Sequence, residues 1–150
     1  MRPLFFVVGV STLVLAFTMH SSGAGEGKKQ IKPTQQWSGK SGDEELAKRA
    51  PKAGYLTDQK TFEELWTAWK LKDKAPVLDF TKQIAFIQLA TGGPNVPRPS
   101  YTLDDKGNLT VLSISTLIGG PGFGYSVDLL NREGIKTYQG KAIEENKDQK

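Results

Sequence analysis

The chain has 150 residues, a formal net charge of +4 and no cysteine. Its length suits one domain, and the lack of cysteine excludes disulfide bonds and thiolate chemistry. The lysines are scattered without interleaved aromatic residues, which argues against a nucleic-acid partner.

The first 24 residues have the pattern of a secretory signal peptide. Arg2 supplies the positive start, an apolar run extends from Leu4 to Phe17, and Ser22-Gly23-Ala24 offers small residues for cleavage. The apolar run is shorter than the about 20 residues that a membrane-spanning helix needs. We therefore expect cleavage after Ala24 and a secreted or periplasmic protein with no membrane anchor.

The next segment is polar. Residues 25–36 predict a flexible leader, so we expect the ordered domain to begin at Trp37. Ser41-Gly42-Asp43-Glu44 has the pattern of a capping box, and basic residues close the segment that it opens, as the helix dipole favours. The sequence therefore predicts a short surface helix from Asp43 to Arg49, ended by Pro51.

The strongest helix signal follows a short extended piece at 54–56. Either Asp58 or Thr61 is expected to start this helix, and Thr61-Phe62-Glu63-Glu64 has the pattern of a second capping box. Its apolar residues share one helix face at i, i+3, i+4 and i+7; they are Phe62, Leu65, Trp66 and Trp69. Such a stripe predicts packing on a sheet, and an aromatic ligand groove is the less favoured alternative.

Several strands are predicted in the second half of the chain. The apolar run 84–90 predicts a strand covered on both faces. Segments 101–103 and 109–116 flank Asp104-Asp105-Lys106-Gly107-Asn108, which predicts a hairpin with Gly107 in the left-handed conformation. Lys106 occupies a position where a calcium loop needs a ligand, so we exclude a calcium site there.

The glycine stretch from Ile118 to Tyr125 is the most informative local feature. It lacks both the Gly-Lys-Ser/Thr of a phosphate loop and the glycine spacing of a dinucleotide-binding fingerprint, and no helix follows it. The first interpretation is a tight loop that shapes the backbone. The functional hypothesis is a protein-recognition edge with aromatic anchors. Its binding residues would be Gly119, Gly120, Gly122, Phe123 and Tyr125.

The chain after this stretch predicts two more strands. Apolar residues alternate from Phe123 to Leu129, which predicts a strand with one buried face. Segment 135–138 predicts a final strand, and 144–150 a charged tail. The expected fold is α+β, a single domain over 37–143 with a mostly antiparallel sheet and one amphipathic helix packed on it.

The composition excludes several kinds of catalysis. The only histidine, His20, lies in the predicted signal peptide, so the mature chain lacks both histidine and cysteine. This excludes Ser-His-Asp and Cys-His catalysis and zinc sites built on these residues, and we expect no metal and no cofactor. A Ser–Lys dyad stays open, with Ser126 nearest the glycine stretch. Four adjacent carboxylate pairs each have a surface or turn explanation: Glu44-Glu45, Glu63-Glu64, Asp104-Asp105 and Glu144-Glu145.

The order of several motifs resembles a known family. Phe62-Glu63-Glu64-Leu65-Trp66, Asp79-Phe80, the strand 84–89 and Gly122-Phe123-Gly124-Tyr125-Ser126-Val127 follow one another as in the C-terminal domain of PrcB, a protease-complex subunit. The family's Gly-Gly-Tyr element is Phe123-Gly124-Tyr125 here. Other stretches are similar to uncharacterised small secreted bacterial proteins. The resemblance covers residues 56–143 and implies a non-catalytic partner in protease assembly.

Three functions are open on this basis. The first is a secreted, non-enzymatic protein-binding module associated with a protease or envelope complex. The second is a small carboxylate-dependent hydrolase or sugar-binding enzyme. The third is a structural envelope protein without a discrete site, whose surface would lack a contiguous apolar patch.

Overall fold

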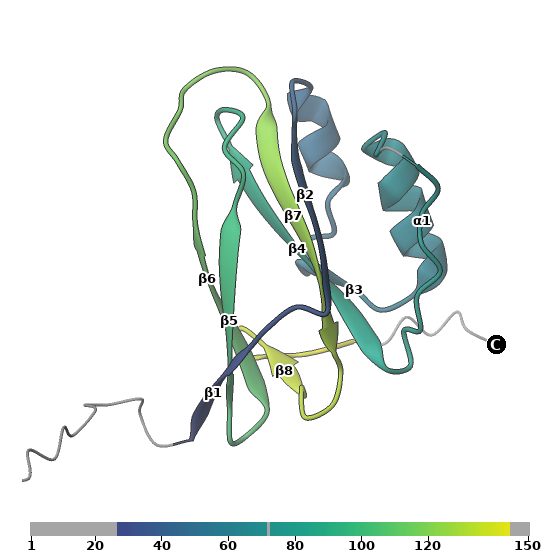
Figure 1. Ribbon diagram of the computed structural model, residues 1–150, viewed down its shortest axis with the longest axis vertical. Coiled ribbons are helices and arrows are strands. Elements are labelled where there is room, and N and C mark those ends of the chain that lie inside the picture. Colours follow the sequence, from purple (N-terminus) through teal and green to yellow (C-terminus); the bar gives the residue numbers. More distant parts are fainter. Residues whose placement is uncertain (1–26, 72, 145–150) are drawn as a thin grey trace, which may run out of the picture.

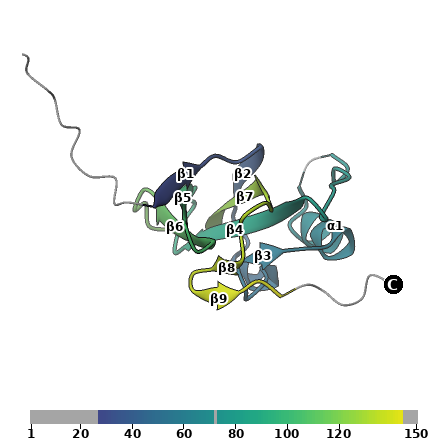
Figure 2. The same ribbon diagram turned by 90° about the horizontal axis from the view of Figure 1, so that it is seen from below.

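The computed structural model describes residues 27–71 and 73–144. The predicted signal peptide and residues 145–150 of the predicted tail lie outside this part. The described elements form three layers, a five-stranded sheet A, a four-stranded sheet B and a helical layer (Figures 1 and 2). A mixed fold with mostly antiparallel strands is thus confirmed, but two sheets stand where the sequence predicted one.

The strands of both sheets pair antiparallel, except that β6 and β8 are parallel. Sheet A has the order β1 (Lys28–Ile31), β5 (Arg98–Asp104), β6 (Asn108–Ile114), β8 (Thr137–Tyr138) and β9 (Lys141–Ala142). Sheet B has the order β2 (Gln35–Ser41), β7 (Phe123–Asn131), β4 (Gln83–Thr91) and β3 (Tyr55–Leu56).

The helical layer consists of the 3-10 helix η1 (Glu44–Arg49) and the α-helix α1 (Gln59–Ala68). Both begin at an aspartate. Asp43 accepts from the amide of Glu45 at 3.1 Å, and Asp58 accepts from the amide of Thr61 at 2.8 Å. These aspartates cap the two helices in place of the expected capping boxes, because a carboxylate just before the first turn satisfies the exposed amides. Of the two starts that the sequence allowed for α1, the structure has Asp58.

Two apolar cores lie on opposite faces of sheet B. The stripe predicted on α1 is buried and packs on one face, together with Phe123, Val127 and Leu129 of β7. The other face packs on sheet A through residues that include Leu130 of β7. The prediction of one buried face for β7 is therefore wrong, because this strand lies inside sheet B with a layer on each side.

The structure also corrects the predicted leader and the final strand. Residues 28–31 pair with β5, and both the amide and the hydroxyl of Thr34 donate to the carbonyl of Leu129. Strand pairing uses backbone groups, so the exposed polar side chains of β1 gave no apolar signal. The strand predicted at 135–138 is shorter, β8 at Thr137–Tyr138, and it is followed by one more strand, β9. The hairpin of β5 and β6 is confirmed, with Gly107 at φ +86°.

Candidate functional site

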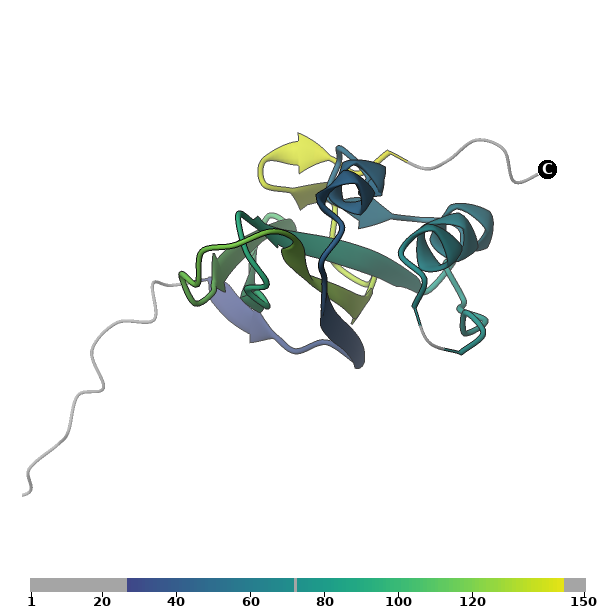
Figure 3. The same ribbon diagram turned by 90° about the horizontal axis from the view of Figure 1, so that it is seen from above.

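The glycine stretch belongs to a loop, residues 115–122, that runs from the end of β6 to the start of β7 (Figures 1 and 3). The buried side chain of Asn95 fixes its first half. Asn95 Oδ1 accepts from Thr116 Oγ1 at 2.9 Å and from the amide of Ile118 at 2.8 Å, and its Nδ2 donates to the carbonyl of Ile118 at 3.0 Å. The amide of Gly122 donates to Glu44 Oε1 at 3.2 Å. The loop is thus held at both ends.

The predicted binding glycines take two different roles. Gly119 and Gly120 are exposed at the tip, and a Cβ added to either would meet nothing within 4 Å. Gly122 is buried at φ +97°, and a Cβ there would overlap the carbonyl oxygen of Ser41. Gly119 and Gly120 are therefore accessible to a partner, whereas Gly122 serves the packing of the loop against β2.

The two predicted aromatic anchors both turn toward the helices. Phe123 is fully buried, with its ring 5.6 Å from Trp69. Tyr125 is half-buried, 5.0 Å from the same tryptophan, and burial raises its pKa. Alternation along β7 puts both rings on the face that α1 covers. Phe123 therefore does not reach the surface, and Tyr125 reaches it only through a groove beside α1.

The exposed apolar side chains lie instead before the glycines. They form what we call the apolar edge: Leu112 (71% exposed), Ile114 (63%), Leu117 (97%) and Ile118 (57%). Every residue from Leu112 to Pro121 is exposed, and no charged residue occurs between Lys106 and Asp128. The sequence-based site missed this edge, although the uncharged run is a signal that would have found it.

The apolar edge continues an unpaired strand edge. β6 pairs with β5 along 109–114, whereas β8 pairs only with Asn108 and Leu109. Among the described residues, the hydrogen bond to 110–114 on that side comes from the side-chain amide of Gln139, which donates to the carbonyl of Val111 at 3.3 Å. Other outer strands of the described sheets are two residues long or carry lysine, as natural proteins do to prevent pairing with other chains. The edge of β6 has neither protection.

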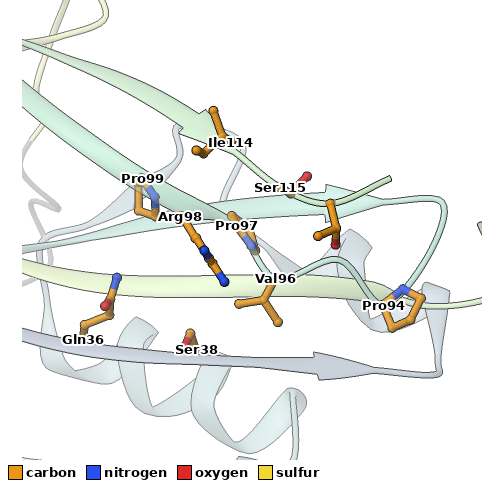
Figure 4. Close-up of a pocket in the computed structure, with 10 residues that line it drawn as sticks. Gln36, Ser38, Pro94, Val96, Pro97, Arg98, Pro99, Ile114 and Ser115 are labelled. Carbon is orange, nitrogen blue, oxygen red and sulfur yellow. The ribbon is translucent and has the colours of Figure 1, made fainter. Parts of the chain in front are cut away.

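A cleft of about 770 Å³ lies beneath the loop, between β2 and the start of β5 (Figure 4). Gln36 and Ser38 line it from β2, and Thr116 lines it from the loop. The opposite wall is the segment 94–99, which holds three prolines. Figure 4 shows the side chain of Arg98 extending from β5 across this cleft toward β2.

A buried polar network lies between the sheets near this cleft. Asp128 accepts from Gln36 Nε2 at 2.6 Å, from Tyr101 Oη at 2.8 Å and from Ser126 Oγ at 3.0 Å. Burial raises the pKa of Asp128, although the three hydrogen bonds oppose this effect. Burial and the nearby carboxylate raise the pKa of Tyr101. Ser126 is fully buried and bonded to a carboxylate, so this position does not support a Ser–Lys dyad.

A second hollow, of about 810 Å³, lies between β2, η1 and α1, and we call it the aromatic groove. All three tryptophans of the chain line it, together with Tyr125, Asp43 and Asp73. Trp66 and Trp69 show little surface, since they mainly pack the core. The groove offers aromatic faces beside two carboxylates, a combination suited to a sugar or an extended peptide.

The carboxylate pairs stay apart in the described residues. Glu44-Glu45 lies on η1, Glu63-Glu64 on the exposed face of α1, and Asp104-Asp105 in the β5–β6 turn, where Asp104 accepts from the amides of Lys106 and Asn108. Glu145 lies outside the described part. Over residues 27–71 and 73–144, no cluster of acidic, histidine or cysteine side chains could hold a metal ion. The same residues contain no helix long and apolar enough to span a membrane.

Comparison of the chain with protein-family models, with curated proteins and with solved structures finds no match. The site must therefore be interpreted from its own geometry.

Proposed function

We propose that this chain is a secreted or periplasmic protein-binding module without catalytic activity, and that a partner protein adds an extended segment to the edge of β6. One observation carries the proposal: the edge of β6 lacks the usual protection and lies beside the exposed Leu112 and Ile114. Strand addition uses such an edge for backbone hydrogen bonds and neighbouring side chains for specificity.

The backbone of β6 has the polarity that strand addition needs. The backbone carbonyl of Leu109 accepts from the backbone amide of Gln139 at 2.9 Å. The backbone carbonyl of Val111 accepts from the side-chain amide of the same Gln139. Backbone groups alternate in direction along a strand. Ser113 therefore also directs its amide and carbonyl away from β5, where an incoming strand would bind them.

The side chains around this edge indicate the chemistry of the partner. Leu112 and Ile114 stand on the same face of β6, two residues apart, and Leu117 and Ile118 extend the apolar surface into the anchored loop. A partner segment with apolar side chains at alternate positions would bury these residues. The resemblance to PrcB and the signal-peptide pattern favour a protease subunit or another envelope protein as that partner.

The test is capture of partners from an envelope fraction by the purified protein, followed by crosslink mapping. Leu112→Lys and Ile114→Lys place a charge on the edge at exposed positions, so both variants should fold. Val77→Lys is the matched control, because Val77 is equally apolar and 83% exposed but lies elsewhere.

The expected result is that the edge variants lose the partner, that the Val77 variant keeps it, and that crosslinks map to 108–118. Unchanged capture by both edge variants would end the assignment. The oligomeric state of the unmodified protein is measured first, because a dimer that Leu112→Lys dissociates would identify a second copy as the partner.

The aromatic groove supports a second candidate function, sugar binding or carboxylate-dependent hydrolysis. Because all three tryptophans line the groove, intrinsic fluorescence reports on it directly. Soluble cell-wall oligosaccharides should quench this fluorescence, and Tyr125→Ala should weaken the response. Asp73→Asn tests hydrolysis. The exposed apolar edge argues against the third candidate, a structural protein without a discrete site.

A further inference from the structure

The face of sheet B that packs on sheet A changes from apolar to polar side chains along its strands. At one end, Ile84, Phe86 and Leu130 are apolar and fully buried against sheet A. Toward the loop, the same face carries Gln88 on β4, and Ser126 and Asp128 on β7. The positions next to these on β2 are Ser38 and Gln36.

Polar groups between two sheets cost stability unless they find partners or water. Ser126 and Asp128 find partners in their network, and Gln36 joins it by donating to both. Gln36 and Ser38 are nevertheless exposed and line the cleft. Positions that would usually complete the apolar core instead form a hydrophilic wall. The cleft thus combines a polar wall with the prolines and Val96 opposite it, and a few polar groups in a concave site can orient a ligand.

Arg98 supplies the charge of this cleft. Its side chain extends from β5 toward β2, on the side of Ser38 (Figure 4). Over residues 27–71 and 73–144, the ion pairs join Lys48 to Glu45 and Lys82 to Asp79, so Arg98 faces the cleft without a carboxylate of its own. Prolines on both sides of Arg98 restrict its backbone. A planar guanidinium matches the oxygen pair of a carboxylate or phosphate.

We propose that the cleft between the sheets binds a small organic anion, whose carboxylate or phosphate oxygens pair with Arg98. Ser38 offers a hydroxyl donor beside them, and Pro94 and Val96 contact the apolar body of the ligand. The buried Asp128 does not oppose such an anion strongly, because three donors surround its carboxyl group. Ile114 at the end of β6 lines this cleft as well as the apolar edge. Arg98 and Ser38 lie outside the edge, so anion binding does not depend on the proposed protein partner.

The test is a nuclear magnetic resonance titration of the purified, nitrogen-15-labelled protein with sodium benzoate and, separately, with inorganic phosphate. We expect saturable shifts at the amides of Ser38, Val96 and Arg98. Arg98→Gln should weaken binding by about tenfold or more, the usual effect of losing a charged hydrogen-bond partner. Arg49→Gln removes the same charge from an exposed position outside the cleft and should leave binding unchanged.

Ser38→Trp provides a second variant, which fills the cleft while keeping the guanidinium, and it should also abolish the shifts. A response to benzoate alone supports a carboxylate ligand, and a response to phosphate alone supports a phosphorylated one. If neither probe gives saturable shifts, or if Arg49→Gln weakens binding as much as Arg98→Gln, the proposal is overturned. Spectra of the unliganded variants establish that each is folded.

Discussion

The hydroxyl group of Tyr101 donates a 2.8 Å hydrogen bond to Oδ2 of Asp128, and both side chains are fully buried. Tyr101 lies on β5 in sheet A and Asp128 on β7 in sheet B, so this bond joins the two sheets through the core. No lysine or arginine of residues 27–71 and 73–144 forms an ion pair with this carboxyl group, and burial raises its pKa. The protonation of Asp128 is therefore linked to the packing of the sheets.

The first prediction concerns the pH dependence of stability. Because the pKa of Asp128 in the folded protein lies above its ordinary value of 3.8, the folded state keeps a proton that the unfolded chain has lost. The contribution of Asp128 to the free energy of unfolding is fully present below pH 3.8 and is lost as the pH rises through the pKa of the folded state. Asp128→Asn should remove this loss, as measured by urea unfolding from about pH 3 to about pH 8.

A matched control for this prediction is Tyr101→Phe, which keeps the ring and the titrating carboxyl group. It removes one hydrogen bond to Asp128 and should cost about 1–3 kcal/mol of unfolding free energy. The loss of stability with rising pH should persist in this variant. If Asp128→Asn shows the same pH profile as the unmodified protein, another group is responsible.

The second prediction separates two glycines of the same stretch. A Cβ on Gly124 would overlap the backbone of Asn95, and a Cβ on Gly119 would touch nothing. Gly124→Ala should therefore destabilise the protein by about 1–3 kcal/mol, as overpacking usually does. Gly119→Ala should change stability by less than about 0.5 kcal/mol. Thermal unfolding measures both, and equal effects would contradict this division.

The elements predicted best are those whose pattern reports burial directly. The spacing of Phe62, Leu65, Trp66 and Trp69 identified the buried face of α1. A helix that packs on one surface repeats its apolar residues every three or four positions, and this repeat can be recognised in the sequence. The uninterrupted run 84–90 correctly indicated a strand with two covered faces. Gly107 marked the β5–β6 turn for an equally local reason.

The misses depend on contacts between distant segments. Lys28–Ile31 forms a strand through backbone bonds that leave no mark on the side-chain pattern. Ser126 and Asp128 suggested an exposed face of β7, since a sequence does not show that Tyr101 and Gln36 satisfy them. For Phe123, the alternation predicted a buried face, whereas the binding hypothesis needed an exposed ring; its burial against Trp69 agrees with the alternation.

The third prediction decides between the two helix starts that the sequence allowed. Asp58 is 6% exposed, and its carboxylate accepts from both the amide and the hydroxyl of Thr61. Asp58→Ala should cost about 0.5–2 kcal/mol of unfolding free energy. Glu64→Ala removes the exposed partner of the alternative capping box and should cost less than about 0.5 kcal/mol. A larger loss for Glu64→Ala would reverse the assignment.

The last prediction concerns the anchoring of the loop by Asn95. Its side chain makes three hydrogen bonds with Thr116 and Ile118, which fix the chain just before the exposed glycines. Asn95→Ala should release this segment, and hydrogen exchange at the amide of Ile118 should become faster. Thr116→Val removes only one of the three bonds and should leave most of the protection. Unchanged exchange in Asn95→Ala would show that other contacts hold the loop.

The same variant links loop order to partner binding. A partner that docks on Leu117 and Ile118 must pay the entropy of ordering the loop when Asn95 no longer holds it. Asn95→Ala should therefore weaken capture of the partner although it alters no residue of the apolar edge. The comparison with Leu112→Lys is informative, because that variant should weaken capture without changing exchange at Ile118. If Asn95→Ala speeds exchange but leaves capture intact, the partner contacts β6 alone and the loop lies outside the interface.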